Sequence, residues 1–68
     1  MSSKIEIVLQ LLSDGGWHSM YELQQLSELN EPQLKMIVSF LEKYDFARTN
    51  FEMKVRANQF FEEFLSQV

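Results

Sequence analysis

Basic side chains are concentrated in one part of this 68-residue chain. Five of the six Lys and Arg residues fall within one short stretch, at Lys35, Lys43, Arg48, Lys54 and Arg56. Side chains of this type neutralise the phosphates of a nucleic-acid backbone. Their spacing makes double-stranded DNA a candidate partner, contacted through residues 35–56.

The remainder of the chain is acidic, which limits such binding. The net charge is −4 and the isoelectric point is about 4.8, whereas nucleic-acid-binding domains are usually basic. Residues 1–34 carry −4, residues 35–58 carry +2 and residues 59–68 carry −2. We therefore expect a single copy of the chain to bind DNA poorly, and a dimer to bind better because it presents the basic stretch twice.

Catalysis and metal binding lack suitable residues. Catalysis needs a positioned acid–base pair or an activated nucleophile, but the chain has a single His and no Cys. Glu62 and Glu63 are neighbours on a predicted helix, so their carboxylates point in different directions. His18 cannot form a metal site alone. We expect no enzymatic activity, no metal site and no cofactor.

Three helix starts are marked by a capping residue followed three positions later by Glu or Gln. These pairs are Ser3 with Glu6, Ser19 with Glu22, and Asn30 with Gln33. We expect the first helix to end at residues 14–16, the second at 29–30, and the third to span about 31–44. The apolar residues expected to face the core are Ile5, Val8, Leu9, Leu12, Leu23, Leu26, Leu34, Ile37, Val38, Leu41 and Tyr44.

The second half of the chain predicts a hairpin and a final helix. Residues 47–49 and 51–53 are expected to be short strands, with Asn50 in the turn, and residues 17–19 a short extended segment. Val55 either continues the strand alternation or lies inside the final helix, which starts somewhere in 54–58. The stripe of that helix is Ala57, Phe60, Phe61, Phe64, Leu65 and Val68.

This element order predicts one α+β, mainly α domain over residues 1–68. Three helices with a helix-turn-helix connection, a wing of two or three strands and a C-terminal helix form the winged-helix arrangement. No apolar run is long enough to span a membrane. We expect a cytoplasmic protein, associated with the nucleoid if it binds DNA.

Nearly all of the chain after residue 20 resembles a known family. The matching positions are Glu22, Leu23, Leu34, Val38, Leu41, Glu42, Asp45, Phe46, Ala47, Phe51, Met53, Arg56 and Phe60. The pattern is similar to that of small archaeal-type winged helix-turn-helix transcription regulators. The chain departs from it at Asp45 and Ala57, where Gly is usual, and at Lys54, where Thr is usual. Asp tolerates the left-handed backbone that the first of these positions requires.

The resemblance implies a transcription regulator or chromatin-associated factor. Its third helix is expected in the major groove of DNA, and its hairpin on an adjacent groove or the backbone. Lys35 and Lys43 would contact phosphates, while Gln33 would pair with adenine and Ser39 with base edges. The complete set of expected DNA-binding residues is Gln33, Lys35, Met36, Ser39, Lys43, Arg48, Lys54 and Arg56.

A second interpretation is a protein–protein interaction module. The third helix has no Arg, and Met36 and Phe40 are apolar where DNA readers are usually polar. In this interpretation Met36, Phe40 and the C-terminal Phe stripe bind a protein. The spatial arrangement of the basic side chains separates the two alternatives. Convergence of Lys35, Lys43, Arg48 and Arg56 on one face favours DNA, whereas scatter favours a protein partner.

The C-terminal stripe also predicts a homodimer. Phe60, Phe64 and Val68 alone would cover the first helix, so Phe61 and Leu65 widen the stripe beyond what one small domain easily buries. We expect a symmetric dimer with an interface formed by Phe60, Phe61, Phe64, Leu65 and Val68.

Three single residues have simpler explanations. Trp17 is expected to pack over the end of the first helix rather than stack on a base, and His18 to be a surface or strand residue. Tyr21 is expected to be a half-exposed aromatic, with a phosphate contact through its hydroxyl as the alternative.

Overall fold

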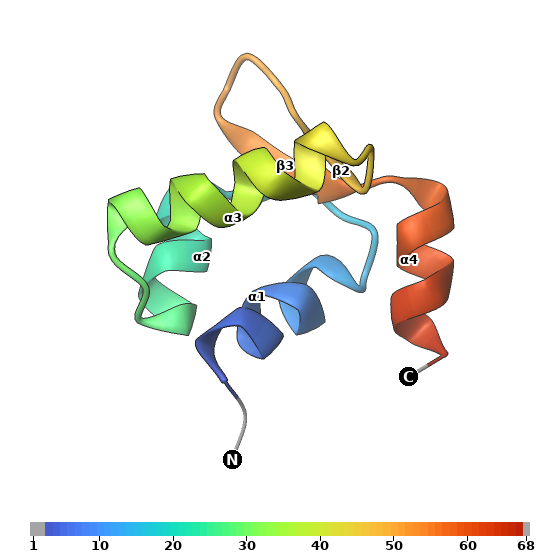
Figure 1. Ribbon diagram of the computed structural model, residues 1–68, viewed down its shortest axis with the longest axis horizontal. Coiled ribbons are helices and arrows are strands. Elements are labelled where there is room, and N and C mark those ends of the chain that lie inside the picture. Colours follow the sequence, from blue (N-terminus) through green and yellow to red (C-terminus); the bar gives the residue numbers. More distant parts are fainter. Residues whose placement is uncertain (1–2, 68) are drawn as a thin grey trace.

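The computed structural model describes residues 3–67, which form a small, mainly helical α+β domain (Figure 1). The elements follow in the order α1 (Lys4–Leu12), β1 (His18–Ser19), α2 (Met20–Ser27), α3 (Glu31–Lys43), β2 (Ala47–Thr49), β3 (Lys54–Ala57) and α4 (Gln59–Ser66). The structure therefore confirms the predicted α+β, mainly helical class and the predicted order of helices and strands.

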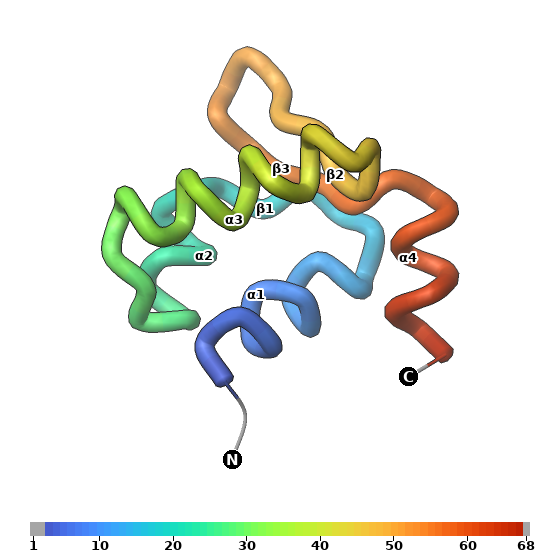
Figure 2. Tube along the Cα trace, viewed as in Figure 1, coloured from blue at the N-terminus to red at the C-terminus, as the bar shows by residue number. Residues whose placement is uncertain are grey.

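The three strands form one antiparallel sheet with β3 in the centre. Val55 of β3 lies opposite His18 of β1 on one side and Thr49 of β2 on the other. The trace in Figure 2 shows the hairpin loop between β2 and β3 rising beyond α3, while α4 leaves the end of β3 and stands beside α1. The short segment predicted before α2 is therefore a strand of this sheet.

The helices start where capping residues satisfy free backbone amides. Ser3, Ser19, Asn30 and Asn58 each accept a hydrogen bond from the amide three residues later. At α3 the bond is reciprocal, because the Gln33 side chain accepts from the Asn30 amide at 3.1 Å. The three predicted helix starts are confirmed, and Asn58 fixes the fourth.

The core is built from one side of each element. Its fully buried members include Val8, Leu12, Leu23, Leu34, Val55 and Ala57. Three predicted core residues are wrong: Ile5 is 50% exposed, Leu26 is 54% exposed and Tyr44 is 53% exposed. Ile5 lies in the first turn of α1, ahead of the buried Val8 and Leu12. In α2 the buried positions are Leu23 and Ser27, one turn apart, which turns Leu26 outward. Tyr44 is the C-cap of α3, where the backbone leaves helical geometry and the stripe no longer applies.

The predicted second strand at 51–53 is also wrong. These residues form the turn, and the strand is β3, at Lys54–Ala57. The Asn50 side-chain oxygen accepts from the amides of Glu52 at 2.9 Å and Lys54 at 3.0 Å, and Met53 adopts a left-handed φ of 61°. Ala57 consequently belongs to the sheet rather than to the last helix. Asp45 has a φ of 59°, as its place after α3 predicted.

Candidate functional site

The exposed side of α3 is the first candidate surface. Residues 28–30 are the whole connection between α2 and α3. Met36 is 69% exposed, and Ser39 and Lys43 are exposed on the same side of the helix. A partner therefore meets one large apolar side chain and two polar ones along the middle of α3.

Most polar groups predicted to contact DNA from α3 have partners within the chain. The ammonium of Lys35 lies 3.0 Å from the carboxylate of Glu31, and the Gln33 side-chain oxygen completes the helix cap. The Lys43 nitrogen lies 5.7 Å from the centroid of the Tyr44 ring. A phosphate or a base that binds these groups competes with their internal contacts.

A groove of about 200 Å³ separates α3 from the hairpin. Its lining residues are Met20, Lys35, Val38, Ser39, Glu42, Thr49 and Met53. Within it the Thr49 hydroxyl donates to the Glu42 carboxylate at 3.1 Å. The negative charge of Glu42, held between α3 and the hairpin, would repel a phosphate backbone that crosses both elements.

The basic residues of the hairpin do not line up with α3. Val55 and Ala57 are fully buried, so strand alternation places Lys54 and Arg56 on the opposite face of the sheet. On β2 the Thr49 side chain reaches α3, so its neighbour Arg48 points away from α3. Two cations thus lie on α3, and three lie on the outward face of the sheet.

Aromatic rings form a continuous line from α3 to α4. The centroid distances are 4.9 Å for Phe40–Tyr44, 6.3 Å for Tyr44–Phe46, 4.8 Å for Phe46–Phe61 and 6.3 Å for Phe61–Phe64. We call these five residues the aromatic strip. Phe40, Tyr44 and Phe64 are each more than half exposed, whereas Phe61 is buried. Phe61 thus fixes the strip in the core, while the rings of Phe40, Tyr44 and Phe64 remain accessible to a partner.

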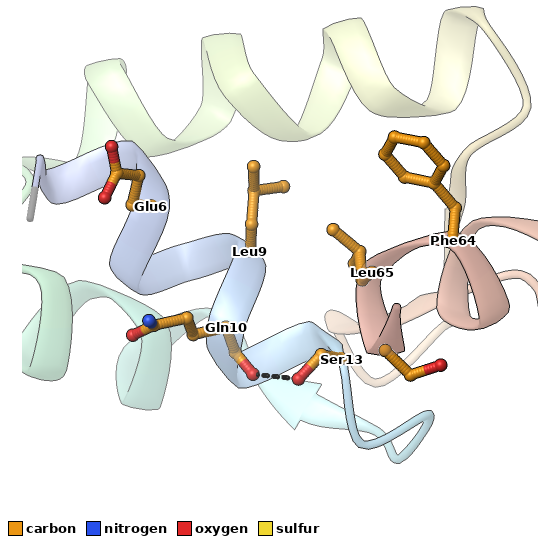
Figure 3. A pocket seen from close by; sticks show the side chains of 7 residues that line it. Glu6, Leu9, Gln10, Ser13, Phe64 and Leu65 are labelled. Carbon is orange, nitrogen blue, oxygen red and sulfur yellow. Dashed lines mark hydrogen bonds between the residues drawn. The ribbon is translucent and has the colours of Figure 1, made fainter. Parts of the chain in front are cut away.

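A groove of about 690 Å³ between α1 and α4 continues the aromatic strip (Figure 3). Its apolar lining is Leu9, Phe64 and Leu65, and its polar rim is Glu6, Gln10, Ser13 and Ser66. Figure 3 shows Leu65 pointing from α4 towards Leu9 of α1, with Phe64 beside it. Phe64 therefore belongs to both the aromatic strip and the groove.

The residues predicted for the dimer interface are placed differently from one another. Phe60 is 73% exposed and Phe64 is 56% exposed. Phe61 is buried and Leu65 packs partly against the core, while Val68 lies outside the described residues. Phe60 and Phe64 are the members that α4 offers to a partner.

His18 forms a cluster that the sequence analysis missed. Its Nδ1 lies 2.7 Å from Glu22 Oε2, and its Nε2 lies 2.9 Å from Asp14 Oδ1. Ionised carboxylates only accept, so this arrangement, in which both ring nitrogens donate, suits the protonated form of the ring. Burial lowers the pKa of His18, but the hydrogen bonds that the ring donates to Asp14 and Glu22 outweigh this effect and raise the pKa above its usual value. The spacing of four residues on each side was the available signal.

This cluster fastens the loop after α1 to the start of α2. The hydrogen bond from His18 lowers the pKa of Asp14, and a bond from the Gly16 amide lowers it further. Both ring nitrogens are occupied by carboxylates, which leaves neither for a metal. Among residues 3–67 no group of His, Cys, Asp and Glu is arranged to hold a metal ion.

Trp17 and Tyr21 lie at the surface near this cluster. Trp17 is 41% exposed, and the guanidinium of Arg56 lies 6.0 Å from its ring centroid. Tyr21 is 72% exposed.

In the described part of the chain, no helix is both long enough and apolar enough to cross a bilayer. No family, curated protein or solved structure matches the chain.

Proposed function

We propose that this chain is a winged-helix domain that works as a protein-interaction module. The observation that carries the proposal is the aromatic strip, in which ring contacts through Phe46 and Phe61 link the exposed rings of Phe40, Tyr44 and Phe64. Aromatic residues are enriched in the buried centres of protein interfaces. A small domain that leaves such rings in water gains free energy when a partner covers them.

The layout of the elements supports the winged-helix assignment. A compact helix pair, α2 and α3, is followed by the β2–β3 hairpin and closed by α4. The division of the basic residues supports the choice of a protein partner. Lys35 and Lys43 on α3 are separated from Arg48 and Arg56, which point away from that helix.

The partner best supported is a second copy of the chain. Lys43 lies beside the Tyr44 ring at the α3 end of the aromatic strip. The other end lies on α4, which carries Glu62 and Glu63 and no basic residue. A two-fold axis that lays one strip antiparallel on the other brings Lys43 of each copy towards the acidic helix of its partner. Such a surface is self-complementary, as a symmetric dimer requires.

Sedimentation equilibrium over a concentration series tests the proposal. The parent chain is expected to form a dimer, and Phe64→Glu to be monomeric because it buries a charge in the aromatic strip. Phe51→Glu is the matched control, because Phe51 is 95% exposed in the hairpin loop and outside the strip. A monomeric parent, or equal dimerisation of both variants, contradicts the proposal.

Double-stranded DNA is the second candidate partner. The exposed side of α3, which carries Ser39 and Lys43, and the hairpin beside it support this alternative. A salt titration of binding to a labelled random duplex tests it, because each neutralised phosphate contributes roughly −0.9 to the slope of log K against log salt. Loss of binding in Lys43→Gln, with the Phe64→Glu variant unaffected, favours DNA over a protein partner.

A further inference from the structure

The sheet face opposite the core carries a second surface, which we call the outer sheet face. Residues of the three strands lie there in two rows, which the same register extends to Trp17 just before β1 and Asn50 just after β2. The first row is Trp17, Arg56 and Arg48, and the second is Ser19, Lys54 and Asn50. Neither row contains an acidic residue. The face holds three positive charges in a chain of net charge −4.

Arg48 and Arg56 are direct cross-strand neighbours. The Asn50 amide donates to the Lys54 carbonyl, and the Asn58 amide donates to the Phe46 carbonyl. By the alternation of an antiparallel ladder, Arg48 and Arg56 are therefore a hydrogen-bonded pair with Cα atoms about 5.5 Å apart. Like charges placed in this way repel. Among residues 3–67, no carboxylate forms an ion pair with either guanidinium.

Arg56 is held in position although one nitrogen of its guanidinium lacks a hydrogen-bond partner within residues 3–67. Its Nε is buried and has no hydrogen-bond partner in the described part of the chain, and its guanidinium packs over the Trp17 ring. Buried polar groups in folded proteins are nearly always paired. An anion bound between Arg48 and Arg56 would relieve the repulsion between them.

We propose that the outer sheet face binds single-stranded nucleic acid. Arg48, Lys54 and Arg56 contact the phosphates: the two guanidinium groups match phosphate oxygens in a bidentate geometry, and the Lys54 ammonium acts as a point charge. Trp17, at the end of the same row, stacks on an exposed base. Proteins hold single strands by combining positive charge along the backbone with aromatic side chains on which bases stack.

The shape of the face and the aromatic ring select this ligand. Neither groove described above lies on it, so the surface is open and suits an extended chain rather than a small anion. An acidic peptide would use the cations but would offer no base to stack on the exposed part of the Trp17 ring. The bases of a duplex are stacked inside it and cannot reach the ring. The surface shares no residue with the aromatic strip, so this proposal is independent of the proposed function.

The experiment uses the intact chain and a labelled oligothymidylate of about 12 nucleotides, within the range that one small domain covers. Fluorescence anisotropy measures binding. Emission from Trp17, the single Trp of the chain, reports stacking. We expect quenching on binding and a slope of log K against log salt of about −2, since three phosphates contribute about −0.7 each.

Matched substitutions locate the site. Arg48→Gln and Arg56→Gln are each expected to weaken binding about tenfold and to reduce the salt slope by about 0.7. Lys43→Gln on α3 removes the same charge and should leave binding unchanged. Arg48 is exposed, so its loss should not lower the melting temperature, which separates lost binding from lost folding.

Four results would overturn the proposal. They are absence of oligothymidylate binding, binding without quenching of Trp17, equal weakening by Arg48→Gln and Lys43→Gln, and tighter binding to a duplex or to polyglutamate. The variant Phe64→Glu should keep full oligothymidylate affinity. Failure of self-association and failure of single-strand binding are therefore distinguishable.

Discussion

At the scale of single residues, the His18 cluster makes folding stability depend on pH. The pKa of His18 is raised in the folded chain above its usual value of 6.5, so its stabilising contribution is complete below 6.5. That contribution is lost as pH rises through the folded-state pKa. The pKa of Asp14 is lowered below 3.8, so its contribution is present above 3.8 and is lost as pH falls through the folded value. The cluster therefore stabilises the folded chain most between pH 3.8 and pH 6.5.

We therefore expect the free energy of unfolding in urea to be higher at about pH 5.5 than at about pH 8.5. His18→Gln keeps two hydrogen-bonding groups but removes the titration, so its stability should change less between these two conditions. Glu22→Gln should retain part of the dependence through Asp14. An equal decrease in the parent and in His18→Gln would show that other groups cause it.

At the scale of elements, α4 depends on its cap. The Asn58 side chain accepts from the Phe61 amide at 3.0 Å, and Phe61 anchors the helix in the core. Asn58→Ala should lower the free energy of unfolding by about 1 kcal/mol, measured by urea titration. Because α4 carries Phe64, the same substitution should also weaken self-association. Gln59→Ala, on the exposed side of α4, is the control and should change stability by less than about 0.5 kcal/mol.

Helix starts could be predicted because a cap is a local device. Ser3, Ser19 and Asn30 act on amides three residues away, and the sequence displays both partners. The predicted second strand starts three residues before the observed β3. The position of β3 depends on the side chain of Asn50 and the left-handed backbone of Met53, which strand alternation does not reveal. Leu26 was misplaced because α2 is only eight residues long, so small changes in its orientation decide which positions are buried.

The candidate surfaces were only partly visible in the sequence. The sequence indicates Met36, Phe40 and the Phe residues of α4, but the contact between Phe46 and Phe61 is tertiary. It joins residues that lie far apart in the chain. The basic stretch was also recognised, yet its division between α3 and the sheet depends on the strand register. The row of Trp17, Arg56 and Arg48 combines two strands with the residue before a third, so it has no local signature.

At the scale of the whole molecule, the surfaces are separate and differ in chemistry. The aromatic strip runs from α3 to α4 and continues into the α1–α4 groove, while the outer sheet face carries Arg48, Lys54 and Arg56. Without those three cations the formal charge of the remaining chain is −7, given the net charge of −4. In a dimer joined through the aromatic strip, the two outer sheet faces stay free for other ligands.

The most direct test of the central claim is the concentration dependence of the amide NMR spectrum. Self-association through the aromatic strip predicts that dilution shifts the amides around Phe40, Tyr44 and Phe64, while those of the hairpin loop at 50–53 stay constant. A spectrum that does not change with concentration would contradict the account. So would shifts confined to the outer sheet face, because the strip would then not be the surface that binds a second copy.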